Sequence, residues 1–377
     1  MTVRENLITT LSRKTPQWVP RAGNLSPAQG ERLLERSGSD DPGRYFRMDP
    51  IAGAGIGRTR RQTDFSGYHR YYPLPMPPDR TRVDEFGIGW VRGSLYHFAD
   101  MVHPMYSFTT LDEFKRFPYP DVTAEYRREG IADQVKELQA EGRPVVASVP
   151  CVGGTLFETS WRMRGLENML ADLLINPDLA GYHLDKLTEM AVDNARFLGS
   201  CGIDMLHTSD DVATQRGMMM SPETWREWFK PRLGAVIAAA RENNPNLHVW
   251  YHSDGDCRAV IPELIEIGVT VLNPVQPECM DPVCIKREYG KYLALWGTIG
   301  TQTTLPFGTP EDVRETVKRM IETVGEGGGL FIAPTHMIEP DVPWENIEAL
   351  YNACEEFGGR VPWWSTSGSW DRVCYPR

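Results

Sequence analysis

From about residue 125 onward, short apolar runs alternate with longer amphipathic stretches, and this alternation limits the available folds more than any other feature. Repeated strand–helix units predict a parallel sheet covered by helices, and their number favours a closed (β/α)8 TIM barrel over an open sheet. The runs typical of buried strands are Pro144–Val149, Met205–Thr208, Leu247–Tyr251, Val269–Leu272, Tyr292–Trp296 and Leu330–Pro334. The amphipathic stretches typical of helices are Ile131–Glu141, Leu166–Leu174, Leu179–Ser200, Pro222–Asn243, Ala259–Ile267 and Pro310–Thr323.

The first third of the chain has a different character. We expect residues 1–125 to form a loop-rich extension packed on the barrel, and residues 126–377 to form the barrel core. Met1–Leu11 and Pro27–Ser37 have helical patterns, whereas the segment 44–106 is rich in Gly, Pro, Arg and aromatic residues and predicts loops with a few antiparallel strands. No low-complexity linker divides the chain, so we expect one domain with an N-terminal extension.

Composition excludes several classes of function. The net charge is −11, from 40 Lys and Arg against 51 Asp and Glu, which argues against nucleic acid as a main partner. No apolar run approaches the roughly 18 residues of a membrane span, and the N-terminus has no apolar signal-peptide core, so we expect a cytoplasmic protein. The seven cysteines include no C-x-x-C pair, which excludes a disulfide framework or a zinc ribbon.

Polar side chains follow the predicted strands at the end where barrel active sites are built. His252 and Asp254 come directly after one strand, and residues two apart in an extended segment point to the same side. His336 follows the last strand. Two imidazoles and one carboxylate on parallel strand ends predict a three-ligand metal site with an open position, best suited to zinc, with iron as the alternative. Cys257 is a further candidate ligand; the alternative is a core histidine beside an aspartate that holds the turn at Gly255.

Other strand-end residues suit catalysis or substrate binding. Asp210 and Asp211 form a carboxylate pair, of which one is expected to cap a helix and the other to hold a cation or act as a base. Glu158 follows a Gly-Gly loop and is expected to face the substrate, with an ion pair to Arg162 as the alternative. We expect four further residues to bind the substrate, namely Phe157, Gln215, Gln276 and Gln302.

Several longer stretches resemble the uroporphyrinogen decarboxylase superfamily, which includes that decarboxylase and corrinoid-linked methyltransferases. The likeness covers most of the chain, and it implies a TIM barrel. It is carried by Met219–Trp225, Ile261–Gly268, Leu272–Pro277, Trp296–Gln302, Leu305–Val313 and Pro343–Ile347.

The resemblance is uneven at the residues that decide function. The decarboxylases carry an N-terminal Arg-Gln-x-Gly-Arg-Tyr signature, and Arg44-Tyr45-Phe46-Arg47 is the nearest counterpart here, which argues against a tetrapyrrole substrate. The methyltransferases hold zinc with a His-x-Cys and a later Cys. Here the first pair reads His252-Ser253-Asp254 and the late position reads His336, so the resemblance implies a metal pocket with harder ligands than thiolates.

Three hypotheses follow. The first is a zinc-dependent methyltransferase that demethylates a small O- or N-methyl compound and passes the methyl group to a separate corrinoid protein. The second is a cofactor-free decarboxylase of an aromatic or pyrrole carboxylate, in which Asp210 or Asp211 stabilises a cationic intermediate. The third is a non-catalytic binding protein. The resemblance also implies a homodimer.

Overall fold

The computed structural model describes residues 1–77, 80–93 and 98–359; residues 360–377 of the predicted barrel core lie outside the described residues. A seven-stranded parallel sheet organises the molecule, in the order β1-β5-β6-β9-β10-β11-β12. Its strands are β1 (Ala52–Gly53), β5 (Val145–Ser148), β6 (Met205–Ser209), β9 (His248–His252), β10 (Val271–Val275), β11 (Ala294–Ile299) and β12 (Leu330–Pro334). All six strands that the sequence predicted are present, and β1 was missed because a two-residue strand leaves no apolar run.

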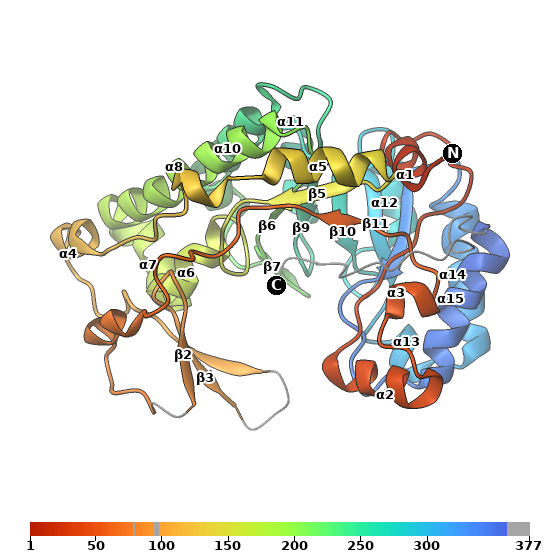
Figure 1. The fold of residues 1–377 in the computed structure, drawn as a ribbon, viewed down its shortest axis with the longest axis horizontal. Helices are drawn as coiled ribbons and strands as arrows, with labels where there is room; N and C mark the ends of the chain where they lie inside the picture. Colours follow the sequence, from red (N-terminus) through yellow and green to blue (C-terminus); the bar gives the residue numbers. More distant parts are fainter. Residues whose placement is uncertain (78–79, 94–97, 360–377) are drawn as a thin grey trace.

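Helices cover the outer face of this sheet (Figure 1). On one side lie α5 (Ile131–Ala140), α8 (Pro177–Ser200), α9 (Pro222–Trp228), α10 (Lys230–Arg241) and α11 (Ile261–Glu266). Around the C-terminal strands lie α12 (Pro282–Tyr289), α13 (Thr304–Phe307), α14 (Pro310–Thr323) and α15 (Trp344–Gly358). The helix predicted over Pro222–Asn243 is divided at Phe229, because Pro231, the second residue of α10, has no N–H to continue the hydrogen bonds of α9.

The sheet is curled, and segments from the N-terminus lie along its last strand. Ile332 N donates to Pro20 O at 2.9 Å, and Ala22 N donates to Ile332 O at 3.2 Å, so the chain around Arg21 runs parallel to β12. Asp49 N in turn donates to Arg21 O at 2.9 Å, just before β1. The predicted α/β fold, a parallel sheet covered by helices, is therefore confirmed. Among the described residues the sheet is a curled half-barrel of seven strands, not the closed eight-stranded barrel that the sequence predicted.

Aromatic side chains fill the inside of the curled sheet. The rings of Trp250 and Trp296 stack with centroids 4.3 Å apart, and those of Trp296 and Phe331 stack at 3.7 Å. Leu7 and Leu11 of α1 (Val3–Leu11) belong to the same buried cluster. This packed layer occupies the sheet interior, and the imidazole of His207 in β6 packs against it, 4.5 Å from the ring of Trp250.

The rest of the N-terminal region forms small elements beside the strand ends. A three-stranded antiparallel sheet lies next to α6 (Phe157–Arg164) and α7 (Leu166–Ile175), as Figure 1 shows. Its strands are β2 (Thr81–Val83), β3 (Gly89–Arg92) and β4 (Ala99–Val102). The remaining elements are α2 (Pro27–Ser37), α3 (Pro42–Tyr45), α4 (Leu111–Arg116) and a 3-10 turn (Ser66–Tyr71), with a small hairpin of β7 (Ala213–Thr214) and β8 (Gly217–Met218) after β6.

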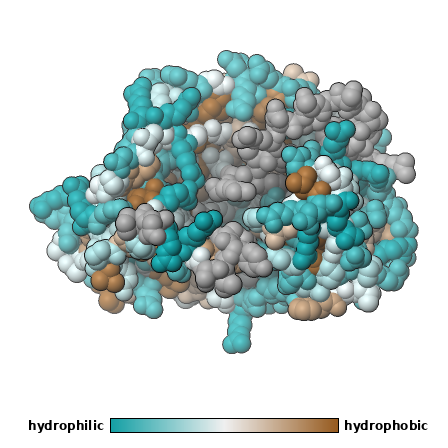
Figure 2. Space-filling view, turned by 60° about the horizontal axis from the view of Figure 1, so that its bottom comes forward, coloured by the Kyte–Doolittle hydropathy of each residue, from teal (hydrophilic) through white to brown (hydrophobic). Residues whose placement is uncertain are grey.

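The surface of the described residues is mostly hydrophilic on the face that Figure 2 shows. No helix among them is both long and apolar enough to cross a bilayer. In Figure 2, hydrophilic residues dominate the face that is seen, and hydrophobic residues form small separate groups. The exposed large hydrophobic residues include Leu174 and Ile175 at the end of α7 and Phe307 at the end of α13, each an isolated position or pair.

Candidate metal site at the strand ends

The end of β9 presents an imidazole with a fixed orientation. His252 Nδ1 lies 2.6 Å from the side-chain oxygen of Asn273, on the neighbouring strand β10. Because an amide oxygen only accepts, Nδ1 carries the proton, and the amide NH2 of Asn273 in turn donates to Trp296 O at 3.4 Å. The Nε2 lone pair is thus left facing the strand ends, as in histidines that bind metals.

Two carboxylates converge on this imidazole. Nε2 of His252 lies 3.7 Å from Oδ1 of Asp211, which also accepts the backbone N–H of Asp254 at 2.8 Å. One ligand atom each of Asp211, His252 and Asp254 lies within 4.8 Å of the other two. The side chains of His252 and Asp211 are 26% and 33% exposed, so the cluster is open to solvent on one side.

The electrostatics of the cluster favour a positive charge. Burial alone lowers the pKa of His252, but Asp254, Asp211 and the Asn273 hydrogen bond outweigh it and leave the pKa above its usual range. One nitrogen and two carboxylate oxygens are ligand types that zinc accepts and that other divalent cations of similar hardness also accept. The donor set therefore fits a divalent metal ion with further positions left for substrate.

Asp210 is held by α6 rather than by the cluster. Its Oδ1 accepts the backbone N–H groups of Leu156 at 3.1 Å and Glu158 at 2.9 Å, at the start of α6. Burial and the nearby charge of Glu158 raise the pKa of Asp210 well above its usual range. Of the adjacent pair, Asp210 anchors a helix terminus and Asp211 points to the metal cluster, which is the division of roles that the sequence left open.

Glu158 lies directly behind Asp211. It is 5% exposed, and Oε2 accepts the backbone N–H of Asp211 at 3.2 Å while Oε1 accepts from Arg162 Nη2 at 2.8 Å. Burial and the charge of Asp211 raise its pKa despite Arg162. The ion pair with Arg162, which the sequence analysis gave as the alternative to a substrate-facing role, is thus present, and Glu158 also holds the Asp211 backbone.

The Gly-Gly loop before α6 provides room for these carboxylates. A Cβ at Gly154 would lie 2.4 Å from Oδ1 of Asp210 and 2.5 Å from the backbone oxygen of Ser209.

We expect Gly154→Ala to lower the free energy of unfolding by about 2 kcal/mol or more, because a backbone oxygen cannot move aside easily. Chemical denaturation measures this. Gly30→Ala, inside α2 with nothing within 4 Å, is the matched control and is expected to stabilise by about 0.5 kcal/mol; equal effects of both variants would contradict the packing argument.

Two predicted metal ligands stand apart from the cluster. His336 is exposed in the turn after β12, and Cys257 is fully buried, where burial raises the pKa of its thiol to about 12. Among residues 1–77, 80–93 and 98–359, the group of side chains placed to share a metal contains Asp211, which the sequence assigned to catalysis, together with His252 and Asp254.

The predicted substrate-binding residues take different positions. Gln215 and Gln302 are exposed, and their side chains share a hydrogen bond of 2.8 Å between the loops after β6 and β11. Gln276 is buried, and its side-chain oxygen accepts the N–H of Gly255 at 3.2 Å. Phe157 is fully buried against Phe229. Only the two exposed glutamines are therefore free to reach a bound molecule without rearrangement.

Sequence reasoning missed the residues that support the cluster. Asn273 fixes His252, and its only signal was its place at the end of a strand next to β9. Arg162 was considered only as an ion-pair partner of Glu158 within the helix, whereas its guanidinium also contacts Trp90 of the N-terminal sheet. The supporting roles of Asn273 and Arg162 can be recognised only when it is known which strands lie next to them.

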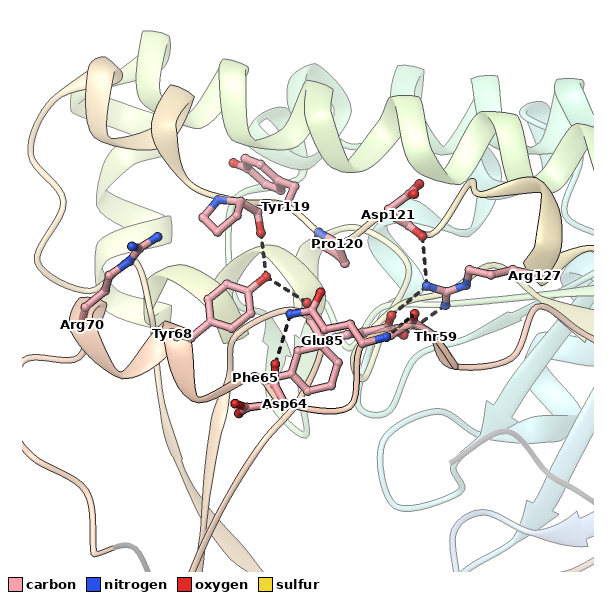
Figure 3. Close-up of a pocket in the computed structure, with 13 residues that line it drawn as sticks. Thr59, Asp64, Phe65, Tyr68, Arg70, Glu85, Tyr119, Pro120, Asp121 and Arg127 are labelled. Atoms are coloured by element: carbon pink, nitrogen blue, oxygen red, sulfur yellow. Dashed lines mark hydrogen bonds and ion pairs between the residues drawn. The ribbon is translucent and has the colours of Figure 1, made fainter.

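A separate cavity of about 320 Å³ lies in the arginine- and tyrosine-rich N-terminal region, between residues 59–70 and residues 118–127 (Figure 3). Arg127 there pairs with Glu85 at 2.8 Å, and Tyr68 donates to Pro118 O at 2.6 Å. The hydrogen bonds drawn hold the walls of the cavity together, so Arg127 and Tyr68 serve the packing of the N-terminal region.

Most of the chain can be matched to known proteins. A family model described as Uroporphyrinogen decarboxylase (URO-D) matches residues 88–357. Methylcobamide:CoM methyltransferase MtaA of Methanosarcina barkeri is 26% identical over 247 residues, 63% of this chain and 66% of that protein. Methylated-thiol–coenzyme M methyltransferase of Methanosarcina mazei is 24% identical over 210 residues, 53% of this chain and 51% of that protein. This chain thus spans slightly less than two thirds of the first relative and half of the second.

A solved structure gives the same fold over nearly the whole chain. It is described as a methyltransferase from Methanosarcina mazei, it is 18% identical, and it covers 95% of this chain and 99% of its own, with a TM-score of 0.61. At this identity the likeness shows the fold alone.

Proposed function

This chain belongs to the uroporphyrinogen decarboxylase (URO-D) family, and we propose that within it the chain is a metal-dependent methyltransferase. The observation that carries the proposal is the convergence of Asp211, His252 and Asp254 at the carboxyl ends of the strands. The names of two relatives support the choice of reaction, since both are methyltransferases and one acts on a methylcobamide. In the proposed ligand set, Asp211 replaces His336, which the sequence analysis had predicted as the third ligand.

The proposed substrate is a small O- or N-methyl compound, and the proposed acceptor is a corrinoid carried by a separate protein. Zinc is the proposed metal, and when bound it supplies a Lewis acid toward the atom that loses the methyl group. Oxygen and imidazole ligands make a harder centre than thiolates do, which suits an ether or amine better than a thiol. In the overall reaction, the ether oxygen keeps the bonding pair and gains a proton, and the reduced corrinoid gives the electron pair that binds the methyl group.

Residues of the chain have distinct tasks in this scheme. His252 is held in one tautomer by Asn273, so its Nε2 needs no reorientation before it binds a cation. Glu158 holds the peptide of Asp211 in place. Gln215 and Gln302, on the exposed loops after β6 and β11, are proposed to contact the substrate or the corrinoid protein.

The test is a methyl-transfer assay with purified, zinc-loaded protein, reduced cobalamin, and a panel of small methyl ethers and methylamines. We expect methylcobalamin to form from at least one compound, and the rate to fall by at least about 100-fold in His252→Ala. Release of carbon dioxide from an aromatic or pyrrole carboxylate by metal-free protein, with full activity in His252→Ala, would contradict the proposal and favour a decarboxylase.

A further inference from the structure

One connection between the N-terminal three-stranded sheet and the metal cluster runs through the cation of Arg162. Arg162 lies on the last turn of α6, and its Nη2 donates to Oε1 of Glu158 one turn earlier at 2.8 Å. The other oxygen of Glu158 accepts the N–H of Asp211 at 3.2 Å. The cation is therefore two hydrogen bonds away from a proposed metal ligand.

The sheet also contacts the guanidinium of Arg162. Trp90 of β3 and Met101 of β4 are cross-strand partners. The guanidinium carbon of Arg162 lies 6.0 Å from the ring centroid of Trp90, and Nη1 lies 3.9 Å from the sulfur of Met101. His103, just beyond β4, donates from Nδ1 to the backbone oxygen of Arg162 at 2.7 Å. Both the side chain and the backbone of Arg162 are thus held by the N-terminal sheet.

The remaining surroundings leave Arg162 little freedom. The ring centroid of Trp161 lies 5.2 Å from its guanidinium carbon. Gly153, at a φ of +78°, packs so closely that a Cβ there would lie 2.4 Å from Arg162 Nε. That Nε is buried and has no hydrogen-bond partner among the described residues. A buried donor without an acceptor lowers the stability of the fold. The other contacts of the guanidinium must therefore outweigh this cost and hold it in place.

We infer that Arg162 is a positioning residue: it fixes the Glu158 carboxylate so that its second oxygen holds the Asp211 backbone, and it makes this arrangement depend on the docked N-terminal sheet. A carboxylate that lost Arg162 would be a buried charge with one hydrogen bond fewer, free to turn away from Asp211. The hydrogen bond between Glu158 and Asp211 is a feature of the fold that needs no metal. Only the catalytic consequence of the inference rests on the proposed function.

The test measures hydrogen exchange of single backbone amides by NMR in the full-length, metal-free protein. In Arg162→Met, which keeps the length of the side chain but removes its charge and donors, we expect the Asp211 amide to exchange about tenfold faster. The Asp210 amide, which donates to His252 O at 3.0 Å, is the internal reference and is expected to be unchanged. Arg162→Lys, which keeps the charge, is expected to restore most of the protection.

Two further variants complete the design. Trp90→Leu removes the aromatic contact from the sheet side and is expected to speed exchange at Asp211 in the same direction, which keeps the inference testable if Arg162→Met does not fold. Arg116→Met removes the exposed ion pair with Asp112, at the same i,i+4 spacing, and is expected to change neither amide.

The inference is overturned if Asp211 exchanges at the wild-type rate in both Arg162→Met and Trp90→Leu, or if Asp210 and Asp211 accelerate equally. The second result would show that the variants loosen the whole strand end. Because no metal or substrate enters the measurement, these results are independent of the proposed function, which fails instead when the wild-type protein neither binds zinc nor transfers a methyl group.

Discussion

Replacing His252 with alanine is expected to weaken zinc binding by at least about 100-fold, the largest effect on the site that the structure predicts. The imidazole is the only nitrogen ligand of the cluster, and its Nε2 is already oriented by the hydrogen bond from Nδ1 to Asn273. Asp211→Asn and Asp254→Asn are expected to weaken binding as well, because an amide is a poorer zinc ligand than a carboxylate. Isothermal titration calorimetry with zinc on metal-free protein measures all three.

Two variants serve as controls for these ligand changes. Asp256 lies two residues beyond Asp254 but is paired with Arg258 at 2.5 Å, so Asp256→Asn is expected to leave zinc affinity within about threefold of wild type. His69 is exposed in the N-terminal region, and His69→Ala is expected to have no effect. Wild-type affinity in His252→Ala, together with loss of binding in Cys257→Ser, would contradict the proposed ligand set.

Replacing Asp210 with alanine is expected to lower the free energy of unfolding by about 3 kcal/mol, the largest effect on stability that the site predicts. The variant leaves the backbone N–H groups of Leu156 and Glu158 without an acceptor in a buried environment. Because burial raises the pKa of Asp210, the neutral Asp210→Asn, which keeps one acceptor oxygen, is expected to cost only about 1 kcal/mol. Urea denaturation of both variants at pH 7 provides the comparison.

The zinc affinity of Asp210→Asn separates a structural role of Asp210 from a role in metal binding. Asp210→Asn is expected to retain zinc affinity, since the side chain of Asp210 anchors α6 and is not a member of the cluster. A variant that remained as stable as wild type but lost zinc would place Asp210 in the metal site and contradict the assignment of Asp211.

Much of the fold was accessible from the sequence because its signals are periodic. The apolar runs marked six of the seven strands of the main sheet. The two-residue spacing of His252 and Asp254 predicted that both face the same side, and their ligand atoms lie within 4.8 Å of each other. The short elements were not accessible: β1 has two residues, and the segment around Arg21 forms only a bridge beside β12. Such segments become recognisable only through the strands that they pair with.

The composition of the cluster was harder to predict than its position. Asp210 and Asp211 are chemically identical neighbours, and only the loop after β6 determines that the first meets α6 and the second meets His252. His336 follows a strand as His252 does, but the turn after β12 leaves it exposed. Loops are not periodic, so residues on them are placed by tertiary contacts that a sequence pattern does not contain.

The most direct test of the account is anomalous diffraction from crystals of the zinc-soaked protein, measured on both sides of the zinc absorption edge. We expect one strong anomalous peak per chain, within coordination distance (about 2.0–2.2 Å) of His252 Nε2 and of oxygens of Asp211 and Asp254. A peak located instead at Cys257 or His336, or no peak at the strand ends at saturating zinc, would contradict it.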